Sequence, residues 1–347
     1  MAATASLTAG GLHAGGAPAV ATFVVAAIAL AALAALIGAA VEQTGEHLGP
    51  GATGLVQSTL GNLPELFVGL FALHAGLVGL VRAALVGSIL ANALFVLGIA
   101  FLVGGLRHGP QPFAKEAPRM IATLLLVAVA ALLVPTLAFD LHTPAAAHSA
   151  ALSYACSVIL LVVYLASVPF WLSGSAETGP SRAESGSQPG GRAGTWSLRV
   201  AVAVLGVAGL GAGFVSDWFV AALRPSLTSL HLSETFTGLV VVAIASNAVE
   251  NAVGVRFAAR NQPDFAVATI LNSPLQIALL LTPILVLASP LMGGAHLTLV
   301  FPPLLVAALV ATIVVVTIVV YDGVVLWLEG LALLALYAII AAAFWWG

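Results

Sequence analysis

Apolar stretches of about 20 residues or more recur along this chain, and they restrict its fold more than any other feature. Each is long enough to cross the hydrocarbon core of a bilayer as an α-helix. Short breaks with turn chemistry, such as Gly109-Pro110, Arg224-Pro225 and Gln262-Pro263, separate them. The sequence therefore predicts an all-α polytopic membrane protein. The expected transmembrane helices number about ten: residues 18–40, 53–79, 82–105, 118–138, 149–172, 197–222, 235–259, 263–289, 298–320 and 323–346.

Composition excludes other broad classes of protein. The chain is 61% hydrophobic and 7% charged, whereas a soluble domain has about 25% charged residues. The net charge of −3 says nothing about nucleic acid, but no basic patch exists to bind one, so the lipid bilayer is the expected partner. Cys156 is the single cysteine, so disulfide scaffolds and cysteine-based metal sites are excluded.

Residues 173–196 differ in kind from the rest of the chain. They are rich in Ser, Gly and Pro with scattered charges, which is typical of a flexible, water-exposed linker. The linker separates a first repeat of five helices, residues 1–172, from a second repeat of five, residues 197–347. Because the number of helices per repeat is odd, the second repeat enters the membrane from the opposite side. We therefore expect inverted repeats, which recur among transporters.

The basic residues predict the orientation. When the expected loops are numbered in order, one side of the membrane receives only Arg82 and Arg224. The other side receives eight: Arg107, Lys115, Arg119, Arg182, Arg192, Arg199, Arg256 and Arg260. Cytoplasmic loops carry the excess of Lys and Arg, so we expect a cytoplasmic linker and extracytoplasmic termini. Short loops and the lack of a targeting sequence favour a bacterial or archaeal cell membrane.

One short polar pattern occurs twice within the apolar stretches. Asn62 and Glu65 recur as Asn247 and Glu250, 185 positions later. The three-residue spacing puts amide and carboxylate on one helix face. A carboxylate in hydrocarbon is costly, so such a residue suggests function. Two of them in matching halves indicate an ion site between internal repeats.

The proposed ligands are all hard oxygen donors. Carboxylates, amides and hydroxyls suit Ca²⁺, which takes 6–8 oxygen ligands, and also Na⁺ or protons. Glu65 and Glu250 are the expected metal ligands. Because burial favours the protonated form of a carboxyl group, the same pair could take up protons when the cation leaves. Protons and cation would then compete for one site, which is a mechanism for exchange.

A second polar element follows in each half. Ser88 and Ser273 match at the offset of 185, whereas Asn92 and Gln276 match only with a slip of one residue. These four complete the expected cation and proton site. Candidates for supporting it, or for the proton path, are Glu42, Ser246, Asn251 and Asn272. The alternative for the amides and hydroxyls is that they only hold neighbouring helices together.

These motifs resemble a known family. Gly61-Asn62 with Glu65, and Asn247-Ala248 with Glu250, are similar to the two α-repeats of the calcium/cation antiporter superfamily. Gly87 to Asn92 and Ser273 to Leu279 are similar to its cation/proton exchanger branch. The resemblance covers essentially the whole chain. It implies a sodium/calcium-exchanger-like fold, Ca²⁺ extrusion driven by H⁺, and a moving gate formed by the helices near 18–40 and 197–222.

The chain departs from that branch within the site itself. The branch usually has Gly at Ser246, His at Asn251, and Gly-Ser-Ser at Asn272-Ser273-Pro274. The alternative to Ca²⁺/H⁺ exchange is therefore an Na⁺(K⁺)/H⁺ or Na⁺/Ca²⁺ antiporter on the same fold. An enzyme is disfavoured because HExxH and similar motifs are missing, and a primary pump because no phosphate-binding loop is present. No resident cofactor is expected, and the oligomeric state is left open.

Overall fold

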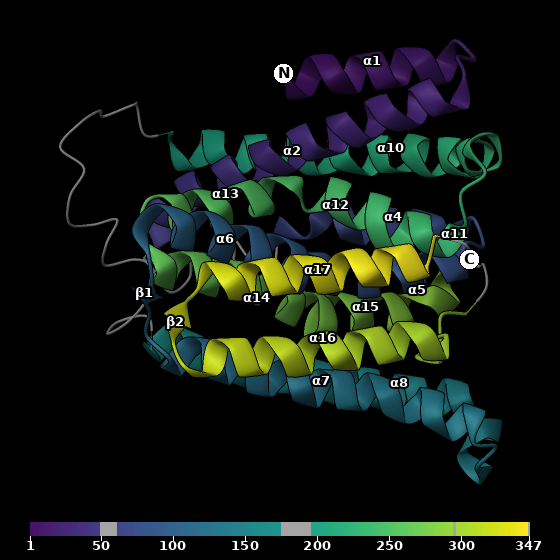
Figure 1. Cartoon of the computed structure of the whole chain (residues 1–347). Helices are drawn as coiled ribbons and strands as arrows, with labels where there is room; N and C mark the ends of the chain where they lie inside the picture. Colours follow the sequence, from purple (N-terminus) through teal and green to yellow (C-terminus); the bar gives the residue numbers. More distant parts are fainter. Residues whose placement is uncertain (49–60, 175–195, 294–295, 346–347) are drawn as a thin grey trace. The chain divides into compact units, whose positions relative to one another are not determined.

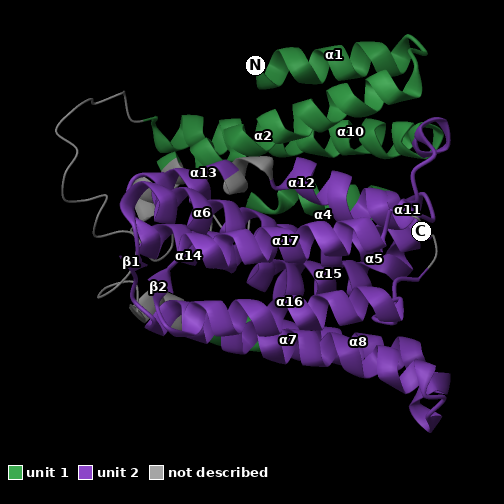
Figure 2. Cartoon of the chain, in the orientation of Figure 1, with its two compact units in different colours: residues 1–71, 162–226 green, residues 72–161, 227–347 purple. Residues whose placement is uncertain are grey.

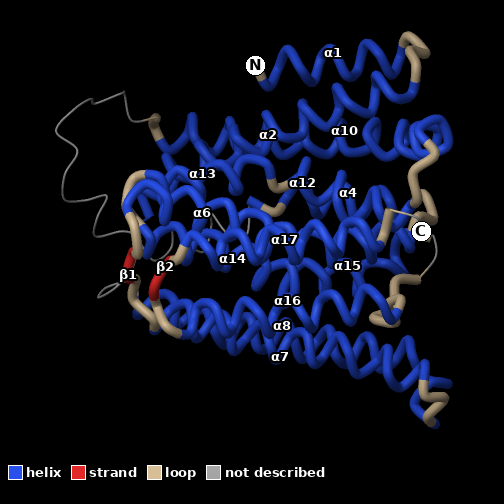
Figure 3. Tube along the Cα trace, in the orientation of Figure 1, coloured by secondary structure: helices blue, strands red, loops and turns tan. Residues whose placement is uncertain are grey.

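The computed structural model describes residues 1–48, 61–174, 196–293 and 296–345, which are mostly helical (Figures 1 and 3). The elements before the linker are α1 (Ala2–Ala14), α2 (Ala19–Leu48), α4 (Leu63–His74), α5 (Val78–Leu90), the π-helix η1 (Ala91–Val96), α6 (Leu97–His108), β1 (Gln111–Pro112), α7 (Glu116–Asp140), η2 (Pro144–His148) and α8 (Ser149–Gly174). Those after it are α10 (Leu198–Leu230), α11 (Glu234–Phe236), the π-helix η3 (Thr237–Val242), α12 (Ala243–Ser246), α13 (Ala248–Ala259), α14 (Pro263–Gln276), the π-helix η4 (Ile277–Leu281), α15 (Thr282–Ala288), η5 (Ser289–Met292), α16 (Pro303–Tyr321), β2 (Val324–Val325) and α17 (Trp327–Ala343).

All ten expected segments overlap helical structure, but not all are long. Among the described residues, seven helical segments have the length and apolar composition to cross a bilayer: Ala19–Val41, Val78–His108, Glu116–Asp140, Pro144–Pro169, Leu198–Leu230, Pro263–Met292 and Pro303–Tyr321. The other three expected segments coincide with shorter apolar helices: Leu63–His74, Glu234–Ser246 and Trp327–Ala343. Residues 53–60 of the second expected helix lie outside the described residues.

Two features of the N-terminal and central helices differ from expectation. The predicted break at Arg224-Pro225 is wrong, because α10 continues to Leu230 with Pro225 inside it. Proline removes only one helical donor, and helices of membrane proteins tolerate this. Helix α1 was not expected, because its 13 residues are too few to form a membrane span.

The duplicated sequence pattern corresponds to a duplicated local structure. Helices α4 and α13 have the same bounds when shifted by 185 residues, and each starts directly after its Asn, 62 or 247. Helices α5 and α14 start at matching positions, and the π-helices η1 and η4 follow them in turn. The local structure that follows each Asn of the duplicated pattern is therefore the same in both halves.

The helices form two compact units, each built from both halves of the sequence (Figure 2). Unit 1 contains residues 1–71 and 162–226, and unit 2 contains residues 72–161 and 227–347. The two units are defined by packing, so they do not coincide with the repeats predicted from the sequence, residues 1–172 and 197–347. Residues 175–195, most of the predicted linker, lie outside the described residues.

Unit 1 is held by apolar and aromatic contacts. Helix α1 packs along α2, and the rings of Phe23 and Phe219 stack with their centroids 4.8 Å apart. A Cβ on Gly211 of α10 would lie 3.4 Å from the Leu33 side chain of α2. Small residues therefore let α2 and α10 approach closely.

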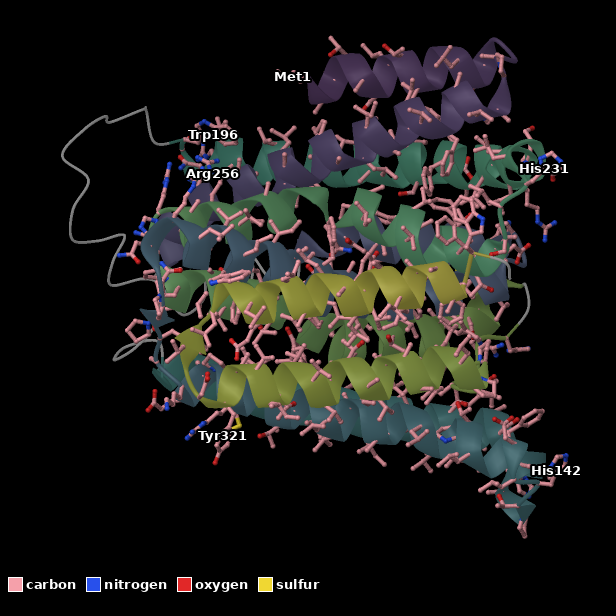
Figure 4. The ribbon with its side chains drawn as sticks, in the orientation of Figure 1. Met1, His142, Trp196, His231, Arg256 and Tyr321 are labelled. Carbon is pink, nitrogen blue, oxygen red and sulfur yellow. The ribbon has the colours of Figure 1, made fainter. Side chains whose placement is uncertain are left out.

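Unit 2 is held by close helix crossings and by links between its loops. A Cβ at Gly87 of α5 would collide with the backbone of Leu239 in η3. At one end, β1 pairs antiparallel with β2 (Figure 3), and Phe113 N–H donates to the Gly323 carbonyl at 2.8 Å. Beside it, Tyr321 ends α16 (Figure 4), and the Arg119 guanidinium lies 4.4 Å from its ring centroid.

Candidate functional site

Four of the predicted site residues meet in the interior of unit 2. Ser88 lies on α5, Asn92 on η1, Asn247 at the break between α12 and α13, and Ser273 on α14. Their exposed fractions are 4%, 1%, 1% and 5%, respectively. We call these four residues the amide cluster. Two come from the first half of the chain and two from the second.

The side chains of the amide cluster are joined directly by hydrogen bonds. Asn92 Nδ2 donates to Asn247 Oδ1 and to Ser273 Oγ, both at 3.2 Å. Asn247 Nδ2 donates to Ser88 Oγ at 3.1 Å, and Ser273 Oγ donates to Asn247 Oδ1 at 3.4 Å. Buried polar groups must find partners, and here each half of the chain supplies partners for the other.

The local backbone explains how these short side chains reach one another. Gly87 and Gly238 lie where α5 crosses η3, and a Cβ on either would meet backbone atoms of the opposite segment. The missing side chains therefore let the two segments approach closely, next to Ser88. Asn92 projects from a π-helix, an uncommon local form that is often found at functional sites.

Three further candidates adjoin the amide cluster in sequence. Ser246 is 8% exposed; its hydroxyl donates to the Val242 carbonyl at 2.9 Å and accepts from Asn247 Nδ2 at 3.2 Å. Gln276 is 3% exposed at the end of α14, and Asn272 is half-buried one residue before Ser273. The hydrogen bond from Asn247 Nδ2 joins Ser246 to the cluster.

The first-half pair belongs to the other unit. Asn62 is 5% exposed at the start of α4, and its carbonyl accepts from Leu66 N–H at 3.0 Å. Glu65 is half-buried in the first turn of the same helix. The side chains of Glu42, Glu250 and Asn251 lie outside the described residues. A site shared by Glu65 and Glu250 therefore stays a prediction.

The chemistry of the amide cluster is that of neutral oxygen and nitrogen groups. Within the described residues, no group of three or more His, Cys, Asp or Glu side chains is placed to hold a metal ion. Amide and hydroxyl oxygens can contribute to a hard-cation site, but they bring no charge. Any cation held in this region needs its counter-charge from carboxylates such as those of the Asn/Glu motifs.

Two polar contacts elsewhere in unit 2 were not predicted from the sequence. Thr282 Oγ1 donates to the Ile277 carbonyl at 2.7 Å, which satisfies a backbone acceptor in η4. Arg82 lies on α5, and its guanidinium donates to Thr298 Oγ1 at 2.8 Å. The only available signal for either was a polar residue within or beside an apolar run.

Comparisons with known proteins extend over the whole chain. The profile of the family described as sodium/calcium exchanger protein matches residues 18–172 and 200–346. The chain is 35% identical over 325 residues to the Ca(2+)/H(+) antiporter of Synechocystis sp., covering 90% of this chain and 87% of that protein. It is 33% identical over 336 residues to the Ca(2+)/H(+) antiporter ChaA of Bacillus subtilis, covering 94% and 92%. The solved structure of native YfkE superposes with a TM-score of 0.82 at 30% identity, covering 100% of both chains.

Proposed function

The chain belongs to the sodium/calcium exchanger protein family, and on that basis we propose that it exchanges Ca²⁺ for H⁺ across a membrane as a secondary antiporter. The resemblance noted from the Asn/Glu motifs is thereby confirmed at the level of the family. The chain is an integral membrane protein, as its relatives and its long apolar helices indicate.

The observation that carries this proposal is the similarity to two proteins named Ca(2+)/H(+) antiporter over at least 87% of their length. Both Asn/Glu motifs fall within the residues that match the family. Exchange needs one site that alternates between cation and protons. Glu65 and Glu250 would bind Ca²⁺ when ionised and release it when protonated, because hydrocarbon disfavours an uncompensated carboxylate.

The finer architecture is part of the proposal. The matching bounds of α4 with α13 and of α5 with α14 support two repeats of five helices. We propose that these repeats are inverted in a ten-helix protein, with a cytoplasmic linker and extracytoplasmic termini. Helices α2 and α10 would form the moving gate, and the small residues between them support sliding.

The test is uptake of ⁴⁵Ca²⁺ into proteoliposomes under an imposed pH gradient, with a parallel assay under a Na⁺ gradient. We expect uptake driven by the pH gradient alone. Uptake that requires Na⁺ would instead establish the alternative Na⁺/Ca²⁺ exchanger, and no Ca²⁺ movement would contradict Ca²⁺ as the substrate.

Glu65→Gln and Glu250→Gln should each abolish this uptake, because an amide can neither carry the counter-charge nor exchange the proton. Glu116→Gln is the control, since Glu116 is exposed at the start of α7. Full uptake in both site variants would exclude the two-carboxylate mechanism.

A further inference from the structure

We infer that Asn247 is a positioning residue and not an ion ligand: hydrogen bonds from the first half of the chain fix it at the break before α13. The sequence alone placed Asn247 among the cation-binding residues, together with Asn92. The inference deepens the proposed exchange, and it rests on that proposal only for the role of Glu250.

The orientation of the Asn247 amide is fixed by a group that can only accept. Its Nδ2 lies 2.9 Å from the carbonyl oxygen of Ala243, one turn earlier. A backbone carbonyl has no hydrogen to give, so the nitrogen must face it and Oδ1 must face the other way. There, Oδ1 accepts from Asn92 Nδ2 and Ser273 Oγ. Both ends of the amide are therefore occupied by protein groups.

The Asn92 amide is oriented by the same argument. Its Nδ2 lies 2.9 Å from the Ser88 carbonyl oxygen, which again only accepts. Asn92 thus presents its nitrogen to Asn247, and the two amides meet as donor and acceptor. Among the described residues, no hydrogen bond is donated to Asn92 Oδ1. Of this pair, Asn92 rather than Asn247 has an oxygen available for a cation.

The Asn247 side chain does not cap helix α13, although its position at the start of the helix would favour capping. It is the residue before the first turn of α13, where Asn side chains commonly accept a hydrogen bond from the helix backbone. Its side chain makes no such bond. It is instead bonded to α12 and to residues of α5, η1 and α14. Contacts from elsewhere in unit 2 therefore set where α13 begins, and Glu250 follows three residues later.

Replacing Asn247 with Asp separates the two roles. If Asn247 were a ligand, the added negative charge would preserve or improve Ca²⁺ binding. If it is a positioning residue, a carboxylate oxygen would face the Ala243 carbonyl and the donor would be lost. We expect Asn247→Asp to raise the KM for ⁴⁵Ca²⁺ uptake about tenfold or more, and we expect the same of Asn247→Ala. A KM within about threefold of the unaltered protein, or a lower one, would overturn the inference.

Ser273→Ala should have a smaller effect on Ca²⁺ uptake, because it leaves the hydrogen bond between Asn92 and Asn247 in place. It removes one of the two donors to Asn247 Oδ1, so we expect a smaller rise in KM than for Asn247→Asp. If Ser273→Ala raised the KM as much as Asn247→Asp, this expected order of effects would be contradicted, because Asn92 would still donate to Asn247 Oδ1.

A double-mutant cycle tests the link without any ion. Unfolding of Asn92→Ala, Asn247→Ala and the double variant would be measured in detergent without Ca²⁺. We expect the double variant to lose clearly less stability than the sum of the two single losses, because that sum counts the shared Asn92–Asn247 bond twice. Additive losses would overturn the inference. This result stands even if the protein does not transport Ca²⁺, which the uptake assay decides separately.

Discussion

The contacts within unit 1 differ in kind from the contacts within unit 2. Unit 2 is linked by directional hydrogen bonds between distant parts of the chain, including the amide cluster and the Thr136 hydroxyl, which donates to the Leu299 carbonyl. The described contacts of α2 with α10 in unit 1 are mainly apolar, such as the Phe23–Phe219 stack. Directional bonds specify one arrangement, whereas apolar contacts between smooth helices change little in energy when the helices shift.

This difference gives the proposed gate a physical basis. Both segments that the sequence suggested as the gate, residues 18–40 and 197–222, lie in unit 1. The amide cluster lies in unit 2. A mobile part needs few directional contacts, and a part that holds α13 in place needs many. The comparison can be tested by substitutions matched between the units.

Gly87→Ala should have the largest effect on folding. Its Cβ would collide with the backbone of Leu239, which cannot rotate away as a side chain could. We expect a loss of more than about 3 kcal/mol, seen as a lower melting temperature or as aggregation during size exclusion in detergent. Gly206→Ala is the control in unit 1, because a Cβ there meets nothing within 4 Å. Equal stability of the two variants would contradict close packing of α5 on η3.

Thr136→Val should have an intermediate effect. The Thr136 hydroxyl donates to the Leu299 carbonyl at 3.1 Å and accepts from Phe301 N–H at 3.0 Å. Valine has nearly the same shape but leaves both buried backbone groups without this partner, at a cost of about 1–3 kcal/mol. Thermal unfolding should show the loss. Thr123→Val, at an exposed position of the same helix, should unfold like the unaltered protein; if it loses as much, the bonds of Thr136 are not the cause.

Phe219→Leu in unit 1 should have the smallest effect. It removes the stacked partner of Phe23, which is worth about 0.5–1.5 kcal/mol beyond area burial. We expect a slightly lower melting temperature with Ca²⁺ uptake retained. Phe214→Leu, at an exposed position of α10, is the matched control. If Phe219→Leu proved more damaging than Thr136→Val, the contrast between the two units would fail.

The sequence predicted the family and the helices well, because both depend on local pattern. Among the described residues, seven of the predicted segments are long and apolar enough to cross a bilayer, and the offset of 185 correctly paired α4 with α13. The break at Arg224-Pro225 failed because one proline need not end a long helix. Helix α1 was missed because its contacts with α2, and not apolar length, stabilise it. Inversion, topology and the carboxylate pair remain predictions.

The site was predicted as a set of residues but not as an arrangement. Ser88, Asn92, Asn247 and Ser273 do come together, although only Ser88 and Ser273 among them match at the offset of 185. That the two amides bond to each other depends on how α5 and α14 pack around the break, which no local pattern encodes. The one-residue slip between Asn92 and Gln276 falls where the π-helices begin. A π-helix has a wider turn, which changes the residue that faces a neighbour.

The pairing of β1 with β2 has a consequence for how the chain is assembled during synthesis. Gln111 pairs with Val325, so the first strand must wait until more than 200 further residues have been made. Unit 1, by contrast, has all its residues once position 226 is reached. Contacts between distant residues form late and slowly. All residues of unit 1 are therefore synthesised before unit 2 is complete. The part of unit 2 that is made first, residues 72–161, lacks its partners until the last helices have been synthesised.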